Sequence, residues 1–351
     1  KGEYLVDLAK EFVKEHGKTL EDKPEAYFAE YAEIKILEMI KSTLTDYGVD
    51  FDVWFSERSL HEDGSISKAV ETLTTAGYTF ESEGALWFKS TEFGDDKDRV
   101  IKKADGTYAY LAADIAYILN KVERGANQLI VILGQDHHSY ATRLHGLHKA
   151  LKLDNKSNLD VVLYQLVHLN ASGELLKMSK RAGNIVTLRE IIDTVGKDVA
   201  RFFFLNRKAD AQLDFDLDLA LKKTDENPVF YIQYAYVRTN SILHKASTVD
   251  EFKDFNTASL ENLDPSAAHL LKKIIHLKTL LTNIGQNLHT HLLSYYTLDL
   301  ARAFHQYYSQ NKVLDISDIK TSQARLALVK IVNENLKLCL QLLGLEQPEK
   351  M

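Results

Sequence analysis

The sequence has little of what marks several common classes of protein. Its single cysteine, Cys339, excludes a disulfide framework and a cysteine-based zinc cluster. Only four prolines occur and 45% of the residues are hydrophobic, so the composition is not that of a disordered chain. No apolar run approaches the roughly 18 residues that a membrane-spanning helix requires. These absences indicate a globular protein without a membrane partner.

Length and charge narrow the possibilities further. A chain of 351 residues is enough for about two to three domains. Its formal net charge of −7 does not favour a general nucleic-acid-binding protein. Residues 226–351 are nearly neutral, with thirteen Lys and Arg against twelve Asp and Glu, so the negative charge lies before them. The chain begins at Lys1 rather than at a methionine, and we expect it to be a fragment.

Hydrophobic spacing predicts an α/β part followed by an all-helical part. Residues 51–55 alternate like a strand, residues 129–133 form an apolar run typical of a buried parallel strand, and residues 161–169 follow as the next strand. Helical spacing recurs at 4–17, 24–37, 66–76, 110–121 and 140–151, then at 191–195, 199–205, 228–246, 265–290, 294–310 and 321–343. Strands separated by helices predict a doubly wound sheet, and we place its boundary with the helical part near residue 226.

The first candidate site is a basic segment that follows the last expected strand. It consists of Lys177, Met178, Ser179, Lys180 and Arg181. Three cations and a hydroxyl on a loop suit a triphosphate, because charge that develops on its oxygens needs donors. Ligands also gather at the carboxyl ends of such strands. A solvated basic loop is the alternative.

A second candidate, Gly134 to His138, lies at the end of the apolar strand 129–133. Polar groups at that position commonly bind ligands. A metal site that adds His145 and His148 is disfavoured because the i, i+4 ligand spacing is missing. A structural capping role for Asp136 is the other alternative.

Two further candidates involve carboxylates. Tyr110 and Asp114 are four residues apart and are expected to share one face of a helix, where they could bind a cation or form a surface pair. Glu57 is expected just past the strand 51–55, where by itself it is an ordinary strand end.

Taken together, these segments resemble the arginyl-tRNA synthetase family of class I aminoacyl-tRNA synthetases. The resemblance runs the whole length and is carried by FDVWFSERSL (51–60), KDRVIKKADGTYAYLAADIAY (97–117), LGQDHH (133–138), KMSKRAGNIVTL (177–188), LDFDLDLA (213–220) and NPVFYIQYAYVR (227–238). It implies the second part of a class I Rossmann-type catalytic fold with an α-helical anticodon-binding bundle. The domains it implies are an insertion and part of the catalytic domain (1–96), the second Rossmann half with the KMSK loop (97–188), a helical connector that contacts the tRNA stem (189–226) and the anticodon-binding domain (227–351).

The family also carries a HIGH-type motif and an N-terminal domain, and the sequence contains neither. The resemblance therefore implies a C-terminal portion that is inactive alone. A non-catalytic tRNA-binding fragment is the competing interpretation. A purely structural helical scaffold is disfavoured, because it gives no reason for carboxylates and lysines at strand ends.

The activity implied is that of arginine–tRNA ligase. The arginine carboxylate attacks the α-phosphate of ATP to give arginyl-adenylate and pyrophosphate, and the arginyl group then passes to the 3′ end of tRNA(Arg). The resemblance implies that Lys177 and Lys180 are catalytic, that residues 177–180 and His138 bind ATP, and that Mg²⁺ accompanies ATP without an identifiable ligand set. Arg181 stands where the family usually has Ser, so its role is open.

For L-arginine, the resemblance implies that Glu57 and Asp114 are the two carboxylates, Tyr110 the acceptor hydroxyl and Gln135 a neighbour of the amino end. A guanidinium presents five donors in a planar fork, which two carboxylates satisfy. Lysine cannot fill that fork, so a buried carboxylate would stay underpaired with it.

For tRNA, Tyr234, Arg238, Tyr308 and Met351 match positions that the family uses near the anticodon loop. Aromatic rings and cations suit unstacked bases, although tyrosines at helical spacing are commonly core residues. The family's Asp-Ala-Leu-Arg motif is permuted here to Asp299-Leu300-Ala301-Arg302. His289, His291 and His305 receive no role. The family default is a cytoplasmic monomer.

Overall fold

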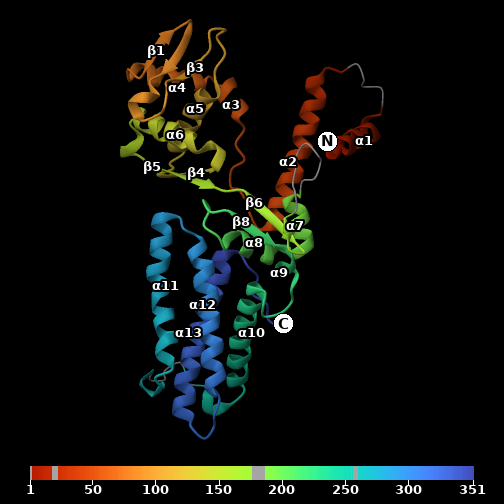
Figure 1. Ribbon diagram of the computed structural model, residues 1–351, viewed down its shortest axis with the longest axis vertical. Coiled ribbons are helices and arrows are strands. Elements are labelled where there is room, and N and C mark those ends of the chain that lie inside the picture. The colour runs from red at the N-terminus through yellow and green to blue at the C-terminus, as the bar shows by residue number, and fades with distance from the viewer. Residues whose placement is uncertain (1, 18–22, 176–185, 254, 256–259) are drawn as a thin grey trace. The chain divides into compact units, whose positions relative to one another are not determined.

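The structure, a computed structural model, describes residues 2–17, 23–175, 186–253, 255 and 260–351 (Figure 1). They form two compact units. The α/β unit comprises residues 51–166 and 209–212, and the helical unit comprises residues 1–50, 167–208 and 213–351. The four domains predicted from the sequence stay predictions. Within the described ranges, none of the helices combines the length and hydropathy needed to cross a membrane.

The α/β unit contains two small sheets and the helices that cover them. Its helices are α3 (Glu57–Glu62), α4 (Ser65–Thr75), α5 (Tyr110–Glu123), α6 (His138–Ala150) and the short 3₁₀ helices η1 (Ser90–Phe93), η2 (Gln135–His137) and η3 (Leu153–Asn155). Its strands are β1 (Thr79–Ser82), β2 (Ala85–Phe88), β3 (Arg99–Lys102), β4 (Gln128–Gly134) and β5 (Asn158–Tyr164). Strands β1, β2 and β3 form an antiparallel sheet, and β4 pairs with β5 in parallel.

The parallel pair β4–β5 confirms the predicted strand–helix–strand unit, in which α6 connects the two strands. One face of the pair packs on the core, where Leu129 is buried beside Ile115 of α5 and Leu147 of α6. The opposite face is open, since Ile130 is 45% and Ile132 is 66% exposed. The expectation that the whole run 129–133 is buried is therefore wrong, because α5 and α6 pack on one side only.

The helical unit is built mainly from long helices (Figure 1). Its helices are α1 (Glu3–His16), α2 (Glu25–Tyr47), α7 (Leu188–Val195), α8 (Lys197–Leu205), α9 (Leu217–Leu221), α10 (Pro228–Ser247), α11 (Ala267–Asn287), α12 (His291–Gln310) and α13 (Ile319–Leu343), with the 3₁₀ turns η4 (Asp250–Phe252) and η6 (Leu260–Asn262). The strands β6 (Val167–Ala171), β7 (Glu174–Leu175) and β8 (Leu213–Asp216) form its small sheet, in the order β7–β6–β8. The long helices after residue 226 confirm the predicted helical part.

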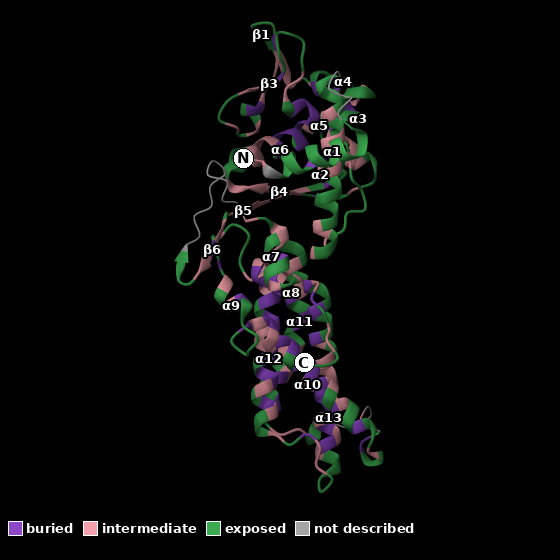
Figure 2. Cartoon of the chain, turned by 90° about the vertical axis from the view of Figure 1, so that its right-hand side faces the viewer, coloured by how far each residue is buried: buried purple, intermediate pink, exposed green. Residues whose placement is uncertain are grey.

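Helices α10 to α13 pack side by side around one core, which Figure 2 shows as buried stretches along each of them. Leu300, Val332 and Leu336 have no exposed surface. The start of α10 follows its sequence: the Asn227 side chain accepts a hydrogen bond from the Val229 N–H at 3.0 Å, and Pro228 occupies the first turn, where its missing N–H costs nothing. The predicted start of this helix at residue 228 is thus confirmed.

Arg201 of α8 ties together three segments of the helical unit. Its guanidinium donates hydrogen bonds to the carbonyl oxygens of Leu343 at 3.0 Å, Tyr47 at 3.0 Å and Gly48 at 3.1 Å. These carbonyls belong to the ends of α13 and α2, where helices leave acceptors without partners. One cation therefore caps two helices.

Three strand predictions are wrong. Residues 51–55 form no strand, and α3 begins directly after them at Glu57. The expected strand 161–169 is divided into β5 and β6, which belong to different units. The spacing after residue 189 predicts helices alone, yet β8 lies there and pairs in parallel with β6.

Candidate functional site

The predicted arginine-binding residues of α5 lie at the start of that helix. The N–H of Ala109, the residue before α5, bonds to the Ile101 carbonyl of β3 at 3.0 Å and so fixes where the helix begins. Tyr110 is 90% exposed, whereas Asp114, one turn later, is half-buried. The predicted shared face thus presents an exposed phenol above a recessed carboxylate.

The pKa of the Asp114 carboxyl is set by its surroundings. Burial raises its pKa above the ordinary value, and the negative charge of Glu57 raises it further. The Tyr140 hydroxyl, which donates a hydrogen bond to Asp114 Oδ2, and the Lys121 ammonium act in the opposite direction. A half-buried carboxylate beside a second carboxylate is a place where a cation is favoured.

Glu57 supplies the second carboxylate, from the first turn of α3. Its side chain is 66% exposed and lies 3.7 Å from His61 Nε2, one turn along the helix. Because Glu57 begins a helix instead of ending a strand, the predicted context is wrong. The structure nevertheless brings its charge within electrostatic reach of both Asp114 and Tyr140.

The segment after β4 lies where the sequence places it, at the carboxyl end of the strand. Gln135 is half-buried in η2, and His138 is exposed as the first residue of α6. Asp136 makes no side-chain cap on α6; it pairs with His137 at 3.7 Å and lies over Gly134, where a Cβ would be 2.6 Å from its carboxylate. Because the Asp136 side chain is 83% exposed, it could turn away from a side chain at this position.

The metal alternative finds no support in the geometry of its histidines. His148 is buried, with Nδ1 3.0 Å from Asp154 Oδ1 and Nε2 2.9 Å from Ser157 Oγ. Both ring nitrogens are therefore engaged in structural hydrogen bonds. Burial lowers the pKa of His145. Within the residues that the structure describes, no three metal-ligating side chains gather at one point.

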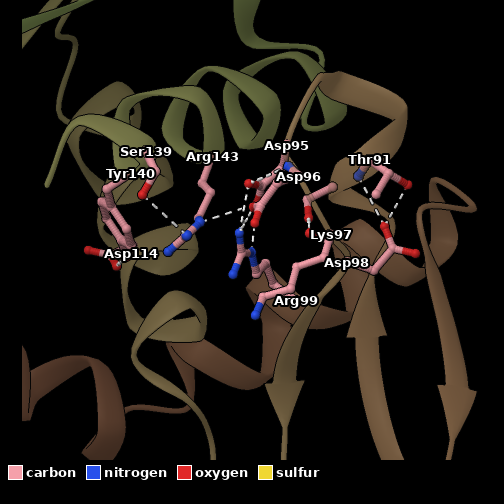
Figure 3. Close-up of polar contacts among 11 residues, drawn as sticks. Thr91, Asp95, Asp96, Lys97, Asp98, Arg99, Asp114, Ser139, Tyr140 and Arg143 are labelled. Carbon is pink, nitrogen blue, oxygen red and sulfur yellow. Dashed lines mark hydrogen bonds and ion pairs between the residues drawn. The ribbon is translucent and has the colours of Figure 1, made fainter.

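Four residues beside this site were missed in the sequence: Tyr140, Arg143, Asp95 and Arg99 (Figure 3). Asp95 Oδ2 accepts hydrogen bonds from Arg99 Nε at 2.7 Å and Arg143 Nε at 3.2 Å, and the hydrogen bond from the Arg99 guanidinium holds the pKa of Asp95 well below its usual range. The Arg143 guanidinium lies 5.5 Å from the Tyr140 ring centroid. The position of Tyr140, in the first turn after a parallel strand, is the one signal that could have identified it.

The basic segment Lys177 to Arg181 lies outside the described residues. The predictions for Lys177, Met178, Ser179 and Lys180 therefore stay predictions. What the structure places are its flanks. Strand β7 ends at Leu175, and Thr187 caps α7, whose Glu190 N–H donates to Thr187 Oγ1 at 3.2 Å.

Three of the four predicted tRNA-binding residues are brought together in the helical unit. Arg238 of α10 lies between two rings, 4.9 Å from the centroid of Tyr234 and 5.2 Å from that of Tyr308 on α12. His305 stacks on Tyr234 with ring centroids 5.5 Å apart. These four side chains, named here the aromatic ladder, place one guanidinium between the ring of Tyr308 and the stacked rings of Tyr234 and His305. Met351 is 55% exposed at the end of the chain, and among the described contacts none joins it to the ladder.

A groove of about 920 Å³ adjoins the aromatic ladder. Its lining residues come from the last turns of α10 and α12 and the segment after α12: Arg238, Ser241, Ile242, Lys245, Tyr308, Ser309, Gln310, Asn311, Lys312, Val313 and Leu314. It offers the three cations Arg238, Lys245 and Lys312 beside the half-buried ring of Tyr308, a combination that suits a nucleotide.

Comparison with known proteins relates both parts of the chain to described families. Residues 1–235 match the family of "tRNA synthetases class I (R), catalytic domain", and residues 232–351 match the "DALR anticodon binding domain". The second match confirms a helical anticodon-binding domain of the DALR type despite the permuted motif. The arginine–tRNA ligases of Oceanobacillus iheyensis and Bacillus subtilis are 43% and 41% identical to the chain, each over 100% of the chain and 64% of the relative. The chain thus spans somewhat less than two thirds of these curated relatives.

Solved structures agree. An arginyl-tRNA synthetase crystal structure from Campylobacter jejuni superposes with a TM-score of 0.89 at 34% identity, over 100% of this chain and 76% of that one. The arginyl-tRNA synthetase of Thermus thermophilus has a TM-score of 0.74 at 19% identity, over 99% and 69%, which shows the shared fold. With its catalytic-domain match over two thirds of its length and its helical anticodon-type domain, the chain belongs to the arginyl-tRNA synthetase family.

Proposed function

We propose that the chain recognises arginine, ATP and tRNA(Arg) as part of an arginine–tRNA ligase. The observation that carries the proposal is the pair of carboxylates at α3 and α5. Asp114 is half-buried and Glu57 acts on it electrostatically, so the two together favour a ligand with an extended positive charge. A guanidinium fits that requirement because its planar fork can donate to two carboxylates at once.

In this proposal each residue of the site has one task. Asp114 and Glu57 receive the guanidinium, and the exposed Tyr110 hydroxyl accepts one of its remaining donors. Gln135, at the end of β4, binds near the amino group of arginine. Lysine has three donors on a point charge and cannot satisfy both carboxylates, so the site discriminates against it without an editing domain.

ATP is assigned to the carboxyl end of β4 and to the segment 177–181. His138 lies exposed at the start of α6, where helix N–H groups favour phosphate. Lys177 and Lys180 neutralise the charge that develops as the arginine carboxylate attacks the α-phosphate and pyrophosphate leaves. Mg²⁺ is assigned to the ATP phosphates, which are its usual ligands at nucleotide sites.

The aromatic ladder is assigned to the anticodon loop of tRNA(Arg), with Met351 nearby. Unstacked bases can lie against Tyr234 and Tyr308, and Arg238 between them contributes a cation. We further place the protein in the cytoplasm as a monomer. Since the sequence has no HIGH-type motif, we expect residues 1–351 alone not to form the adenylate.

The test is arginine- and tRNA-dependent ATP–pyrophosphate exchange by the complete protein. Asp114→Asn removes the buried charge with little change in shape, and we expect it to lower kcat/KM for arginine by about 10²-fold or more, since a charged partner is lost. Glu81→Gln, an exposed carboxylate of β1, is the matched control and should behave like the wild type. Full exchange by Asp114→Asn would overturn the proposal.

A further inference from the structure

We infer that Tyr140 is a positioning residue for arginine recognition, because its phenol fixes the Asp114 carboxylate so that one oxygen faces the incoming guanidinium. The inference rests on the proposed function and adds to it a residue that has no task there. It also assigns a support to Tyr140, formed by Arg143, Asp95 and Arg99.

The two oxygens of the Asp114 carboxylate have different surroundings. Tyr140, in the first turn of α6, donates its hydroxyl hydrogen to Oδ2 (Figure 3). Hydrogen bonds from a hydroxyl to a carboxylate are among the stronger ones in proteins. Within the described part of the chain Oδ1 accepts no hydrogen bond, so it is the oxygen left for a ligand. The phenol thus sets the rotation of the carboxylate.

The Tyr140 ring is supported by a neighbouring ion-pair network. Arg143 follows it on α6, and its guanidinium lies 5.5 Å from the Tyr140 ring centroid. The Asp95 carboxylate, 3% exposed, anchors Arg143 and is itself held by Arg99 of β3. The hydrogen bond from Arg99 lowers the pKa of Asp95, so it favours the ionised carboxylate on which this support depends.

The backbone around this support is equally close-packed. Gly146 of α6 faces Phe93 of η1, where an added Cβ would lie 3.0 Å from the Phe93 side chain. Helix α6 therefore approaches the segment that carries Asp95 without an intervening side chain. The chain of contacts from β3 to Asp114 runs through packed groups at each step (Figure 3).

The charges around Asp114 act on its protonation in opposite directions. The groups that face Asp114 are Glu57 from α3, Lys121 from α5 itself and Tyr140 from α6. Burial and Glu57 favour the protonated carboxyl, whereas Tyr140 and Lys121 favour the carboxylate. A guanidinium has donors only, so it needs the carboxylate. The phenol therefore supports the form of Asp114 that binds.

Tyr140→Phe in the complete protein tests the inference, because it removes the hydroxyl and keeps the ring on Arg143. Steady-state arginylation of tRNA(Arg) is measured from pH 6 to 9. We expect KM for arginine to rise about tenfold, the effect of one lost hydrogen bond to a charged group, while kcat and KM for ATP stay within about twofold. The pH below which KM for arginine rises should move upward, since Asp114 then loses a group that keeps it ionised.

Two further variants separate positioning from general damage. Tyr78→Phe removes a phenol hydroxyl elsewhere in the α/β unit, where its ring packs on Phe93, and should leave all constants unchanged. Arg143→Gln keeps the Tyr140 hydroxyl, so it should raise KM for arginine by a smaller factor and leave the pH profile in place.

An unchanged KM and pH profile for Tyr140→Phe would overturn the inference, and so would an equal loss of kcat and of affinity for both substrates. Failure of the proposed function looks different. In that case the wild type shows no arginylation, or Asp114→Asn retains it.

Discussion

Cys339 lies on α13 without exposed surface, and burial raises the pKa of its thiol to about 12. Only the thiolate reacts with disulfide reagents. We predict that the folded protein does not react with such a reagent at pH 8 and that one thiol per chain becomes reactive on unfolding. With an aromatic disulfide reagent, the absorbance of the aromatic thiol that is released measures how much of Cys339 has reacted, with and without denaturant. Rapid reaction of the native protein would show that the core around α13 opens readily.

Asp198 of α8 is a second side chain whose titration is set by burial. Its Oδ2 accepts hydrogen bonds from the Gln233 amide at 2.7 Å and the Glu346 N–H at 2.9 Å, yet Oδ1 is buried without a partner. Burial outweighs those bonds and raises the pKa of Asp198 above its ordinary value of 3.8.

A carboxyl with a raised pKa in the folded state binds its proton more tightly there than in the unfolded state. Its stabilising contribution is therefore present at acid pH and is lost as the pH rises from about 4 through the folded-state pKa. We predict that the free energy of unfolding of the wild type falls relative to that of Asp198→Asn over this window. Urea titrations at several pH values measure the difference. A constant difference would contradict the assignment.

The intervals between residues along the sequence predict part of the site at the scale of single residues. Tyr110 and Asp114 share a helix face because a four-residue interval requires it. Tyr140 could not be found that way, since its bond to Asp114 spans 26 residues and depends on how α5 and α6 pack. The same holds for Arg238 and Tyr308, whose approach requires α10 beside α12.

Among the elements, the long helices and the strand 129–133 were predicted well, whereas most other strands were not. The long helices carry repeated apolar positions and explicit caps, such as Asn227 before α10. Residues 51–55 show strand-like alternation but pair with no other strand. Strand β8, only four residues long, exists because β6 lies beside it, a long-range condition that local spacing does not record.

Gly344 at the end of α13 and Gly285 within α11 offer a matched pair of glycine substitutions. Gly344 follows the helix with φ +69°, and a Cβ there would lie 2.6 Å from Arg201 Nε. We predict that Gly344→Ala lowers the free energy of unfolding by about 2 kcal/mol or more, because the backbone is strained and Arg201 must leave its carbonyls.

Gly285 within α11 is the control. It has helical backbone and no atom within 4 Å of an added Cβ. Gly285→Ala should therefore raise the free energy of unfolding by about 0.5–1 kcal/mol. Denaturant unfolding monitored by circular dichroism compares the two variants, and equal effects would mean that Arg201 does not act as described.

At the scale of the whole molecule, the packing units do not follow the chain in order. The chain passes from the helical unit to the α/β unit after residue 50 and returns at residue 167. Sequence reasoning placed a boundary near residue 226, where the strand signal is already absent and long helices begin. It could not show that α2 packs on α7 and α8 or that β6 pairs with β8, since that depends on tertiary contacts.

Separate cores predict separate unfolding. The core around Leu147 and that around Leu300 share no residue. We expect two calorimetric transitions, one for each unit. Leu147→Ala leaves a cavity in the α/β unit, so it should lower the free energy of unfolding of that unit alone, by about 2–5 kcal/mol. Gly344→Ala should lower only the other. One transition that both variants shift equally would show that the units unfold as one body.

The open face of β4 and β5 has a consequence for handling the protein. The register sets Ile132 opposite Val162 and Gly134 opposite Tyr164, so apolar groups collect at one end, while Asp160 beside Ile130 supplies charge at the other. Salting-out agents strengthen the burial of such a surface, and chaotropes weaken it. The choice of anion in the buffer will therefore affect the aggregation of a concentrated protein solution more strongly than the protein's net charge of −7 suggests.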